Sequence, residues 1–165
     1  MYTITELEDA VIARLAPLKV DYAPAAGPSD PDIWRTVRTI KSYQGELDDE
    51  AGNAAVLRIM PAILCVYSGS DYAEHGARKW EKPLFTLFVC DKSLRVEDEA
   101  RRGGAGNPGA YALLGGVRDL LYGARLGLDI LPLILMAERP VWFGKGVAIY
   151  SAEYGTGQAL LYPGD

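Results

Sequence analysis

The side chains best suited to covalent chemistry are two cysteines, Cys65 and Cys90, and the only histidine, His75. An imidazole within reach of a thiol can act as its general base, so these residues could serve a thiol-dependent enzyme. Their surroundings favour a different use. Both cysteines lie in apolar runs typical of buried strands, whereas His75 lies in a polar stretch that we expect at the surface. We therefore expect two reduced, buried thiols, and we retain a Cys/His enzyme as an alternative.

No other motif in the sequence predicts a bound metal or cofactor. Two cysteines and one histidine are too few soft ligands for a tetrahedral zinc site. The glycines from Gly103 to Gly109 precede a helical pattern, as in a phosphate-binding loop, but no Lys-Ser or Lys-Thr pair follows them. The acidic clusters at 48–50 and 97–99 lack the ligand spacing of a calcium-binding loop. We expect a protein that has no cofactor and is not an enzyme.

Length and composition predict one domain over residues 1–165. Hydrophobic residues make up 49% of the chain and charged residues 24%, which is enough apolar material for a single core. The net charge of −5 has the wrong sign for binding nucleic acid through its phosphates, so we expect no sequence-specific nucleic acid. The longest charge-free apolar stretch, residues 59–70, is too short to cross a bilayer, and the N-terminus lacks the pattern of a secretory signal. We expect no membrane partner and a cytoplasmic product.

Hydrophobic periodicity predicts a mixture of helices and strands. Thr3 with Glu6, and Thr5 with Glu8, each form a capping box that predicts a helix start, and Pro17 ends that helix. Since no βαβ unit repeats, the order of elements predicts a single-domain α+β fold, with about three helices packed on a mostly antiparallel, mixed sheet. The expected elements are helices at 3–16, 47–60 and 110–121 and strands at 33–43, 62–67, 84–91, 131–137 and 147–154, of which 62–67 and 84–91 pair as a hairpin.

Two glycine-rich segments carry further predictions. Residues 97–109 have almost no apolar anchor, which predicts a mobile loop unless a partner binds it. At the end of this loop, Asn107 is expected to cap the following helix and Pro108 to take its first position. Gly115 and Gly116 lie inside that helix, where a glycine costs about 1 kcal/mol relative to alanine. We therefore expect a close approach to another backbone there.

Aromatic and basic side chains are the candidates for contacts with other proteins. The chain has 10 tyrosines and 3 tryptophans, and such rings are enriched at interfaces, although cross-strand pairs within a sheet explain the same content equally well. We select Tyr72 and Trp80, in the hairpin tip expected from Ser70 to Glu81, and Arg101 and Arg102, in the glycine-rich loop. The two arginines could contact a negative partner surface or only keep the loop solvated.

Several segments together resemble the small tail proteins of Mu-like phages and prophages, a family similar in size and layout to tail-completion, or terminator, proteins. The resemblance extends from Thr5 to about Tyr154 and includes no catalytic signature. The blocks that carry it are TELEDAVIARL, VRTIKSYQGELDDE, MPAILCVYSG and GAYALLGGVRDLLYGARLGLDILPL, with polar or turn positions at Tyr43, Gly45, Asp48, Pro61 and Asp129.

The resemblance implies a virion component, assembled in the host cytoplasm, that forms a ring at the end of the tail tube and stops its polymerisation. The ring is expected to hold six copies. The implied partners are other copies of the chain, the tail tube protein, and a tail sheath, neck or connector protein. A closed ring uses head-to-tail contacts between two different surfaces, so exposed aromatics, an open sheet edge and loops that order on assembly are expected. A small ligand- or peptide-binding domain stays open beside the Cys/His enzyme.

Overall fold

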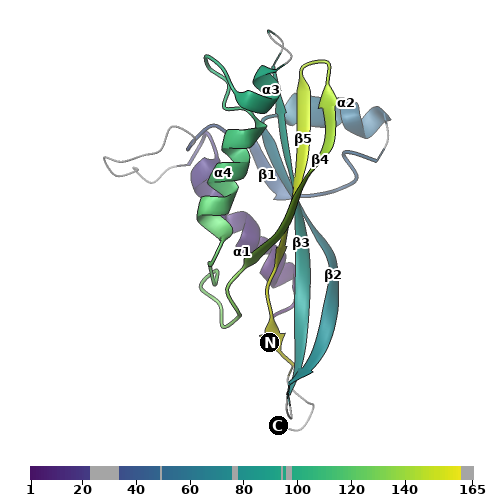
Figure 1. The fold of residues 1–165 in the computed structure, drawn as a ribbon, viewed down its shortest axis with the longest axis vertical. Helices are drawn as coiled ribbons and strands as arrows, with labels where there is room; N and C mark the ends of the chain where they lie inside the picture. The colour runs from purple at the N-terminus through teal and green to yellow at the C-terminus, as the bar shows by residue number, and fades with distance from the viewer. Residues whose placement is uncertain (23–33, 49, 76–77, 94, 96–97, 161–165) are drawn as a thin grey trace, which may run out of the picture.

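The computed structural model describes residues 1–22, 34–48, 50–75, 78–93, 95 and 98–160, and it is built on one mixed sheet (Figure 1). The strands are β1 (Thr39–Ser42), β2 (Ala62–His75), β3 (Arg78–Lys92), β4 (Ile134–Gly144), β5 (Val147–Gly155) and β6 (Gln158–Ala159). The helices are α1 (Ile4–Arg14), α2 (Glu50–Ile59), α3 (Glu99–Arg102) and α4 (Ala110–Leu121), with a 3-10 turn, η1 (Ala16–Leu18). This arrangement confirms the predicted α+β fold class.

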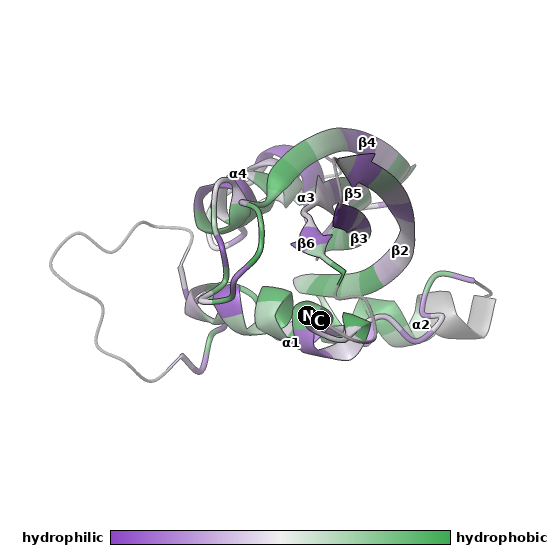
Figure 2. Ribbon diagram, turned by 90° about the horizontal axis from the view of Figure 1, so that it is seen from below, coloured by the Kyte–Doolittle hydropathy of each residue, from purple (hydrophilic) through white to green (hydrophobic). Residues whose placement is uncertain are grey.

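The sheet has the strand order β1-β2-β3-β5-β4, and the short β6 pairs with β3. β1 runs parallel to β2, and the other strand pairings are antiparallel. Seen from below, β2, β3, β5 and β4 curl into an open arc with β6 inside it (Figure 2). β1 and β4 are therefore the two edge strands of this sheet, as far as the described residues show.

The β2–β3 hairpin is the longest feature of the fold. Its pairing runs without interruption from Ala62 with Cys90 to His75 with Arg78, apart from one bulge near Ser68. The hairpin is confirmed, but the prediction of a polar connection between two short strands is wrong, because that connection continues the strands. The part of β2 and β3 beyond this bulge extends past the helices, and we call it the arm (Figure 1). Short polar and charged residues are compatible with strands that are solvated on one side.

The strand predicted at 147–154 is confirmed as β5, and the other two remaining strand predictions are right in type and shifted in position. The strand expected at 33–43 is confirmed only over β1, and residues 23–33 lie outside the described part of the chain. The strand expected at 131–137 begins later and continues to Gly144, through Pro140. Proline lacks a backbone N–H, and an edge strand is a place where that loss is tolerated. β6 was not predicted, because two residues carry no periodic signal.

α1 and α4 cover one face of the sheet. Thr3 caps α1 through the predicted capping box with Glu6, and the apolar stripe Leu7, Val11 and Leu15 is fully buried. The main core joins this stripe to inward residues of α4, β2, β3 and β5; from α4 they are Leu113, Leu114, Val117, Leu120 and Leu121. Each fully buried leucine of this kind contributes about 1.5 to 3 kcal/mol, so this face holds most of the stabilising apolar contact.

α2 covers only part of the opposite face. Val56 and Met60 pack there on Leu64, Cys90 and Ile149 in a second, smaller cluster. Side chains alternate between the faces of a strand, so the rest of this face, toward the arm and β4, is left without a helix over it. This unequal cover is the main asymmetry of the molecule.

The glycine-rich segment before α4 contains regular structure, where the sequence predicts a loop. Its described part, 98–109, contains α3 and a tight turn in which Gly104 and Asn107 exchange backbone hydrogen bonds of 3.0 and 3.1 Å. Asn107 does not cap α4 and Pro108 does not take its first position, because α4 starts at Ala110 with Gly109 at the N-cap; the Asn107 amide donates to the Glu99 carbonyl. The sequence could not predict this order, since it depends on contacts outside the segment.

The expected close approach at the glycine pair inside α4 is not found at Gly115. A Cβ added there would meet nothing within 4 Å among the described atoms, so alanine would fit. The tight glycine position lies just before the helix, at Gly109, where φ is +77° and an added Cβ would lie 2.2 Å from the Gly103 nitrogen. Glycine is required at that position by its positive φ and by this contact.

Tyr154 suggests a simple test of the core. The side chain is fully buried, and its hydroxyl has no hydrogen-bond partner among the described residues. A buried polar group without a partner costs about 1 to 3 kcal/mol. Tyr154→Phe is expected to raise the free energy of unfolding in urea by about 1 kcal/mol. Tyr150→Phe, whose half-buried hydroxyl lies 3.5 Å from that of Tyr111, is the control and should change little. Destabilisation by Tyr154→Phe would contradict this packing.

Candidate interaction surfaces

The two thiols are placed where they cannot reach a substrate. Cys65 and Cys90 are free and fully buried, and they belong to clusters on opposite faces of the sheet. Burial raises the pKa of Cys65 far above its ordinary value and that of Cys90 to about 12, which keeps both groups as neutral thiols. His75 ends β2, and its side chain lies outside the described part of the structure. The geometry gives the Cys/His hypothesis no support.

Other chemical sites receive no support from the described residues either. No group of three or more His, Cys, Asp or Glu side chains in that part of the chain could hold a metal ion. Within the same residues, no helix is long and apolar enough to span a bilayer. The informative features of this structure are therefore its surfaces.

Arg101 lies on the surface formed by α3 and the β4–β5 hairpin. Its guanidinium lies 2.8 Å from the Asp98 carboxylate and 5.8 Å from the ring centre of Phe143, which is 57% exposed. Beside this pair, Tyr111 and Tyr150 meet edge to face at 5.6 Å. Arg102 is exposed on the same short helix. Arginine beside exposed aromatic rings is the composition of many interface hot spots.

A buried carboxylate holds this surface in place. Asp91, at the end of β3, is fully buried and accepts the N–H of Gly109 at 2.8 Å and that of Lys92 at 2.8 Å. Burial raises the pKa of the Asp91 carboxyl from its ordinary 3.8 to about 6, although these N–H bonds act in the opposite direction. The carboxylate ties the turn after α3 to the sheet. No local motif marked Asp91, because its partner is 18 residues away.

Tyr72 and Trp80 lie on the arm and are not in a loop. Tyr72 is 58% exposed, and the ammonium of Lys79 lies 5.5 Å from its ring centre. Trp80 is half-buried in β3, where it pairs with β6. Beneath them Glu81 accepts hydrogen bonds from Ser70 at 2.9 Å and, from β6, Gln158 at 2.9 Å. The arm is therefore a fixed support for its exposed aromatic side chains.

The neighbouring β6 also fixes the start of the chain to the arm. The buried Gln158 side chain accepts the backbone N–H of Tyr2 at 2.7 Å and donates to its carbonyl at 2.9 Å. The hydroxyl of the same tyrosine accepts the N–H of Asp129 at 3.1 Å. Three distant parts of the chain thus meet where the arm leaves the body of the protein.

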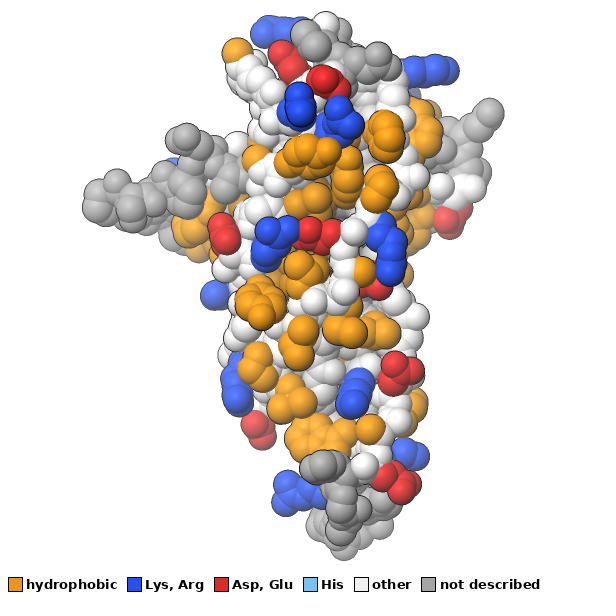
Figure 3. All heavy atoms as spheres, viewed as in Figure 1, with side chains coloured by type: hydrophobic (Ala, Val, Ile, Leu, Met, Phe, Trp, Pro, Cys, Tyr) orange, Lys and Arg blue, Asp and Glu red, His pale blue; other side chains and the backbone are white. Residues whose placement is uncertain are grey.

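β4 carries a group of five of the twelve exposed large hydrophobic side chains of the described residues, with Trp142 on the α2 side of the strand and Phe143 on the α3 side. We call its members Ile134, Met136, Val141, Trp142 and Phe143 the β4 row; they are 47 to 60% exposed. Figure 3 shows hydrophobic side chains along this side of the molecule, interrupted at mid-height by basic and acidic ones. Trp142 and Val141 also line an apolar cleft of about 570 Å³ that β4 and β5 form with α2. A surface of this kind usually marks a contact site.

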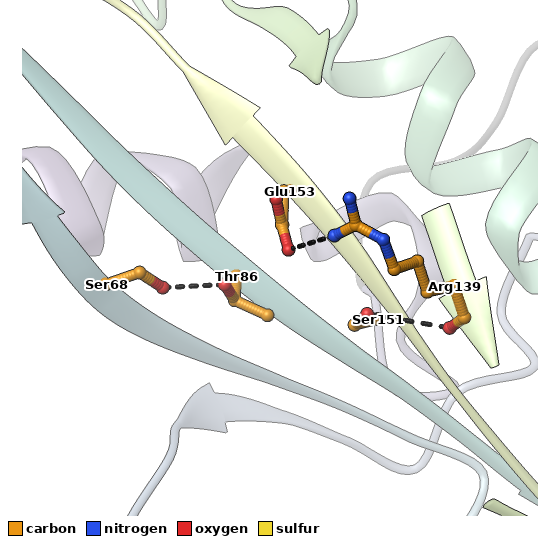
Figure 4. Close-up of polar contacts among 5 residues, drawn as sticks. All are labelled: Ser68, Thr86, Arg139, Ser151 and Glu153. Atoms are coloured by element: carbon orange, nitrogen blue, oxygen red, sulfur yellow. Dashed lines mark hydrogen bonds and ion pairs between the residues drawn. The ribbon is translucent and has the colours of Figure 1, made fainter. Parts of the chain in front are cut away.

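The uncovered face beside the β4 row is polar and held by side-chain pairs (Figure 4). Arg139 donates to Glu153 at 2.9 Å, and the hydroxyls of Ser68 and Thr86 lie 2.6 Å apart. The Ser151 hydroxyl reaches the Arg139 carbonyl at 3.5 Å. One contact joins β2 to β3 and the other two join β5 to β4, so polar pairs lie on both halves of this face, next to the apolar side chains of β4. That combination resembles the rim and core of an interface.

Sequence reasoning selected four residues and missed the β4 row. The structure brings Arg101 and Phe143 together, and separately places Tyr72 and Trp80 on the arm, away from α3 (Figure 1). The missed signal was available in part: the stretch from Leu131 to Gly144 has apolar residues at successive positions, where a half-buried strand would alternate.

Comparison with known proteins identifies one matching family. The family model described as "Bacteriophage Mu, Gp37" matches residues 3–159, which is nearly the whole chain. The match confirms the resemblance to small proteins of Mu-like phages. A comparison with curated protein sequences finds no match.

Solved structures with a similar fold include a chain of a virion-like particle. A chain in the structure titled "Virion of native gene transfer agent (GTA) particle" superposes with a TM-score of 0.52 over 97% of this chain and 100% of that one. The sequences are 14% identical, so the similarity concerns the fold alone.

Asp91 predicts a specific pH dependence of stability. Its folded pKa lies above its unfolded value, so between about pH 4 and pH 6 the folded chain binds more protons than the unfolded chain. Its contribution to stability therefore decreases as pH rises through this window, by up to about 1.4 kcal/mol per pH unit, and is constant above it. The difference in urea stability between wild type and Asp91→Asn should show this slope. An identical pH profile for both proteins would contradict the assignment.

The β4 row should contribute little to the stability of the isolated chain. Trp142→Ser and Phe143→Ser remove side chains that are already about half exposed, so each should lower the free energy of unfolding by only about 1 to 2 kcal/mol. The matched variant in the core, Phe85→Ala, should cost about 3 to 5 kcal/mol. Urea unfolding of the three variants makes the comparison. Losses of the same size in all three would mean that the row belongs to the core.

Proposed function

Because the chain belongs to the Bacteriophage Mu Gp37 family, and is therefore a structural protein of a phage-type virion, we propose that it is a tail terminator. In this role copies of the chain form a ring, of six members, at the end of the tail tube and stop the tube from growing. The partners are the tail tube protein and a sheath, neck or connector protein.

The observation that carries this proposal is the β4 row. Five large apolar side chains are exposed together on one strand, and they contribute to no core cluster of the described chain. Removing apolar surface from water contributes about 25 cal/mol per Å², so this row favours association strongly once a partner of matching shape is present. A chain that worked alone would gain nothing from this exposure.

The backbone of β4 favours contact through side chains over strand addition. Pro140 interrupts its hydrogen-bonding edge, and bulges at Met136 and Val141 break its register with β5. Prolines and bulges on edge strands are devices that prevent uncontrolled edge-to-edge pairing. A ring needs a contact that closes after a fixed number of copies, and a continuous sheet edge would instead allow open fibres.

The arm offers the second surface that a head-to-tail ring requires. It extends beyond the body of the protein and carries Tyr72 and Trp80, whereas the β4 row and Arg101 belong to the body (Figure 1). In a closed ring every such pair of surfaces is used, so the ring offers no free head-to-tail site to a further copy. A tube that meets the ring then has no further site for its own subunits.

The proposal is tested with purified chain and purified tail tube protein. Native mass measurement should find a species of six times the 17.9 kDa monomer, alone or at the end of the tube. Electron microscopy should show that wild-type chain stops tube growth. Trp142→Ser with Phe143→Ser, and Arg101→Glu with Arg102→Glu, should fold normally by circular dichroism and fail to stop it.

Tyr122→Ser is the matched control, because Tyr122 is 65% exposed and lies outside both proposed surfaces. It should form rings and stop growth as wild type does. Continued tube growth in the presence of folded wild-type chain, with the chain remaining monomeric, would refute the terminator role.

A further inference from the structure

A basic groove of about 870 Å³ lies on the other side of the turn that follows α3, and it shares Met60 with the apolar cleft beside α2. One wall is the segment Arg35 to Arg38, just before β1, and the other is the turn from Gly104 to Pro108, just before α4. Lys92 at the end of β3, with Val20 and Pro61, completes the lining. It is larger than the apolar cleft beside α2, at about 570 Å³.

The charged side chains among the described lining residues of the groove are all positive. Arg35, Arg38 and Lys92 contribute three cations, and no Asp or Glu is among its described lining residues. Arg38 is exposed, and no ion pair joins it to a carboxylate of the described residues. The Lys92 ammonium donates to the carbonyl of Leu57 and has two further N–H groups. This concentration of positive charge occurs on a chain whose net charge is −5.

The walls are fixed before any ligand arrives. On one side the N–H of Arg38 donates to the Pro61 carbonyl at 2.9 Å, and that of Thr36 to the Leu18 carbonyl at 3.0 Å. On the other side the turn is tied to the buried Asp91 through Gly109. A site with fixed walls loses little entropy on binding, which increases its affinity.

Arg35 is held in a strained conformation at the rim of this groove. Its φ of +60° is in the left-handed region, which costs a non-glycine residue about 1 to 2 kcal/mol. Such strain persists where the surrounding structure imposes it, and it is found preferentially at ligand sites. The strained backbone of Arg35 supports a ligand site here, although the shape and the charge of the groove are the stronger evidence for one.

We propose that the basic groove binds a carboxylate-bearing segment of a second copy of the chain. The inference rests on the proposed function, because a ring supplies such a neighbour. The charge favours this occupant: outside the groove each copy is even more acidic than its net charge indicates. The apolar lining at Val20 and Pro61 suits the side chains of a peptide segment. The acidic net charge disfavours a nucleic acid phosphate.

Carboxyl-to-amine crosslinking tests the occupant directly, because Lys92 carries the only side-chain amine among the described lining residues. Equal amounts of ¹⁴N and ¹⁵N chain are mixed, assembled and treated with a zero-length carbodiimide crosslinker. Mass spectrometry should find Lys92 joined to an Asp or Glu of the other isotope. Arg38→Glu, alone and with Lys92→Glu, should raise the protein concentration at half-assembly by about tenfold or more. Arg38→Lys should assemble nearly as wild type does.

Arg125→Glu is the matched control, because Arg125 is an exposed arginine in the turn after α4, outside the groove. Circular dichroism checks that each variant is folded. Rings that form equally well with Arg38→Glu, and give no mixed-isotope crosslink at Lys92, would overturn the inference and leave the terminator role intact.

Other outcomes separate the two proposals as well. A groove-dependent, mixed-isotope crosslink in a dimer that never closes into a ring would support the groove and count against the terminator role. A chain that stays monomeric, alone and with tube protein, and gives no mixed-isotope crosslink would overturn both. The groove could also be tested with a labelled DNA duplex. If wild-type chain binds the duplex, Arg38→Glu abolishes that binding, and Lys92 gives no mixed-isotope crosslink, then the occupant of the groove is a phosphate backbone and not an acidic segment.

Discussion

The packing of α1 and α4 on one face of the sheet is the interaction on which the rest of the structure depends. It buries the apolar stripes of both helices in the main core of the described chain. The opposite face receives only α2, whose cluster is smaller. A sheet of this length has more surface than the remaining helices can cover. The uncovered part, with the β4 row along it, is what the protein can offer to other molecules.

The surfaces are supported by polar contacts buried beneath them. Asp91 fixes the turn beside Arg101, and Glu81 with Gln158 fixes the base of the arm. In each case the bond joins residues far apart in the sequence, so the outer side chains are carried on a rigid base. This pre-organisation is useful for a protein that acts by contact, because ordering flexible loops would reduce the affinity of every interface.

The sequence predicted what local signals determine and missed what distant contacts determine. The capping box at Thr3 and the apolar stripe of α1 are local, and both are confirmed. The order of residues 98–109 depends on Asp91, and the lower half of the hairpin depends on cross-strand pairing of polar residues, so neither could be found from composition. Of the selected residues, Arg101 and Tyr72 lie at the surface. The β4 row is signalled only in part by the sequence, because its exposure depends on the place of β4 at the edge of the sheet.

The central claim is that the chain works through its exposed surfaces as part of a phage-type particle. Hydroxyl-radical labelling of Met136 and Trp142, read by mass spectrometry, tests this claim most directly. It measures the solvent exposure of two reactive side chains that are about half exposed in the isolated chain. Labelling should be strong in the free protein and should fall several-fold when the chain is part of purified tails. Equal labelling in both states would mean that the β4 row faces solvent in the particle, and would contradict the account.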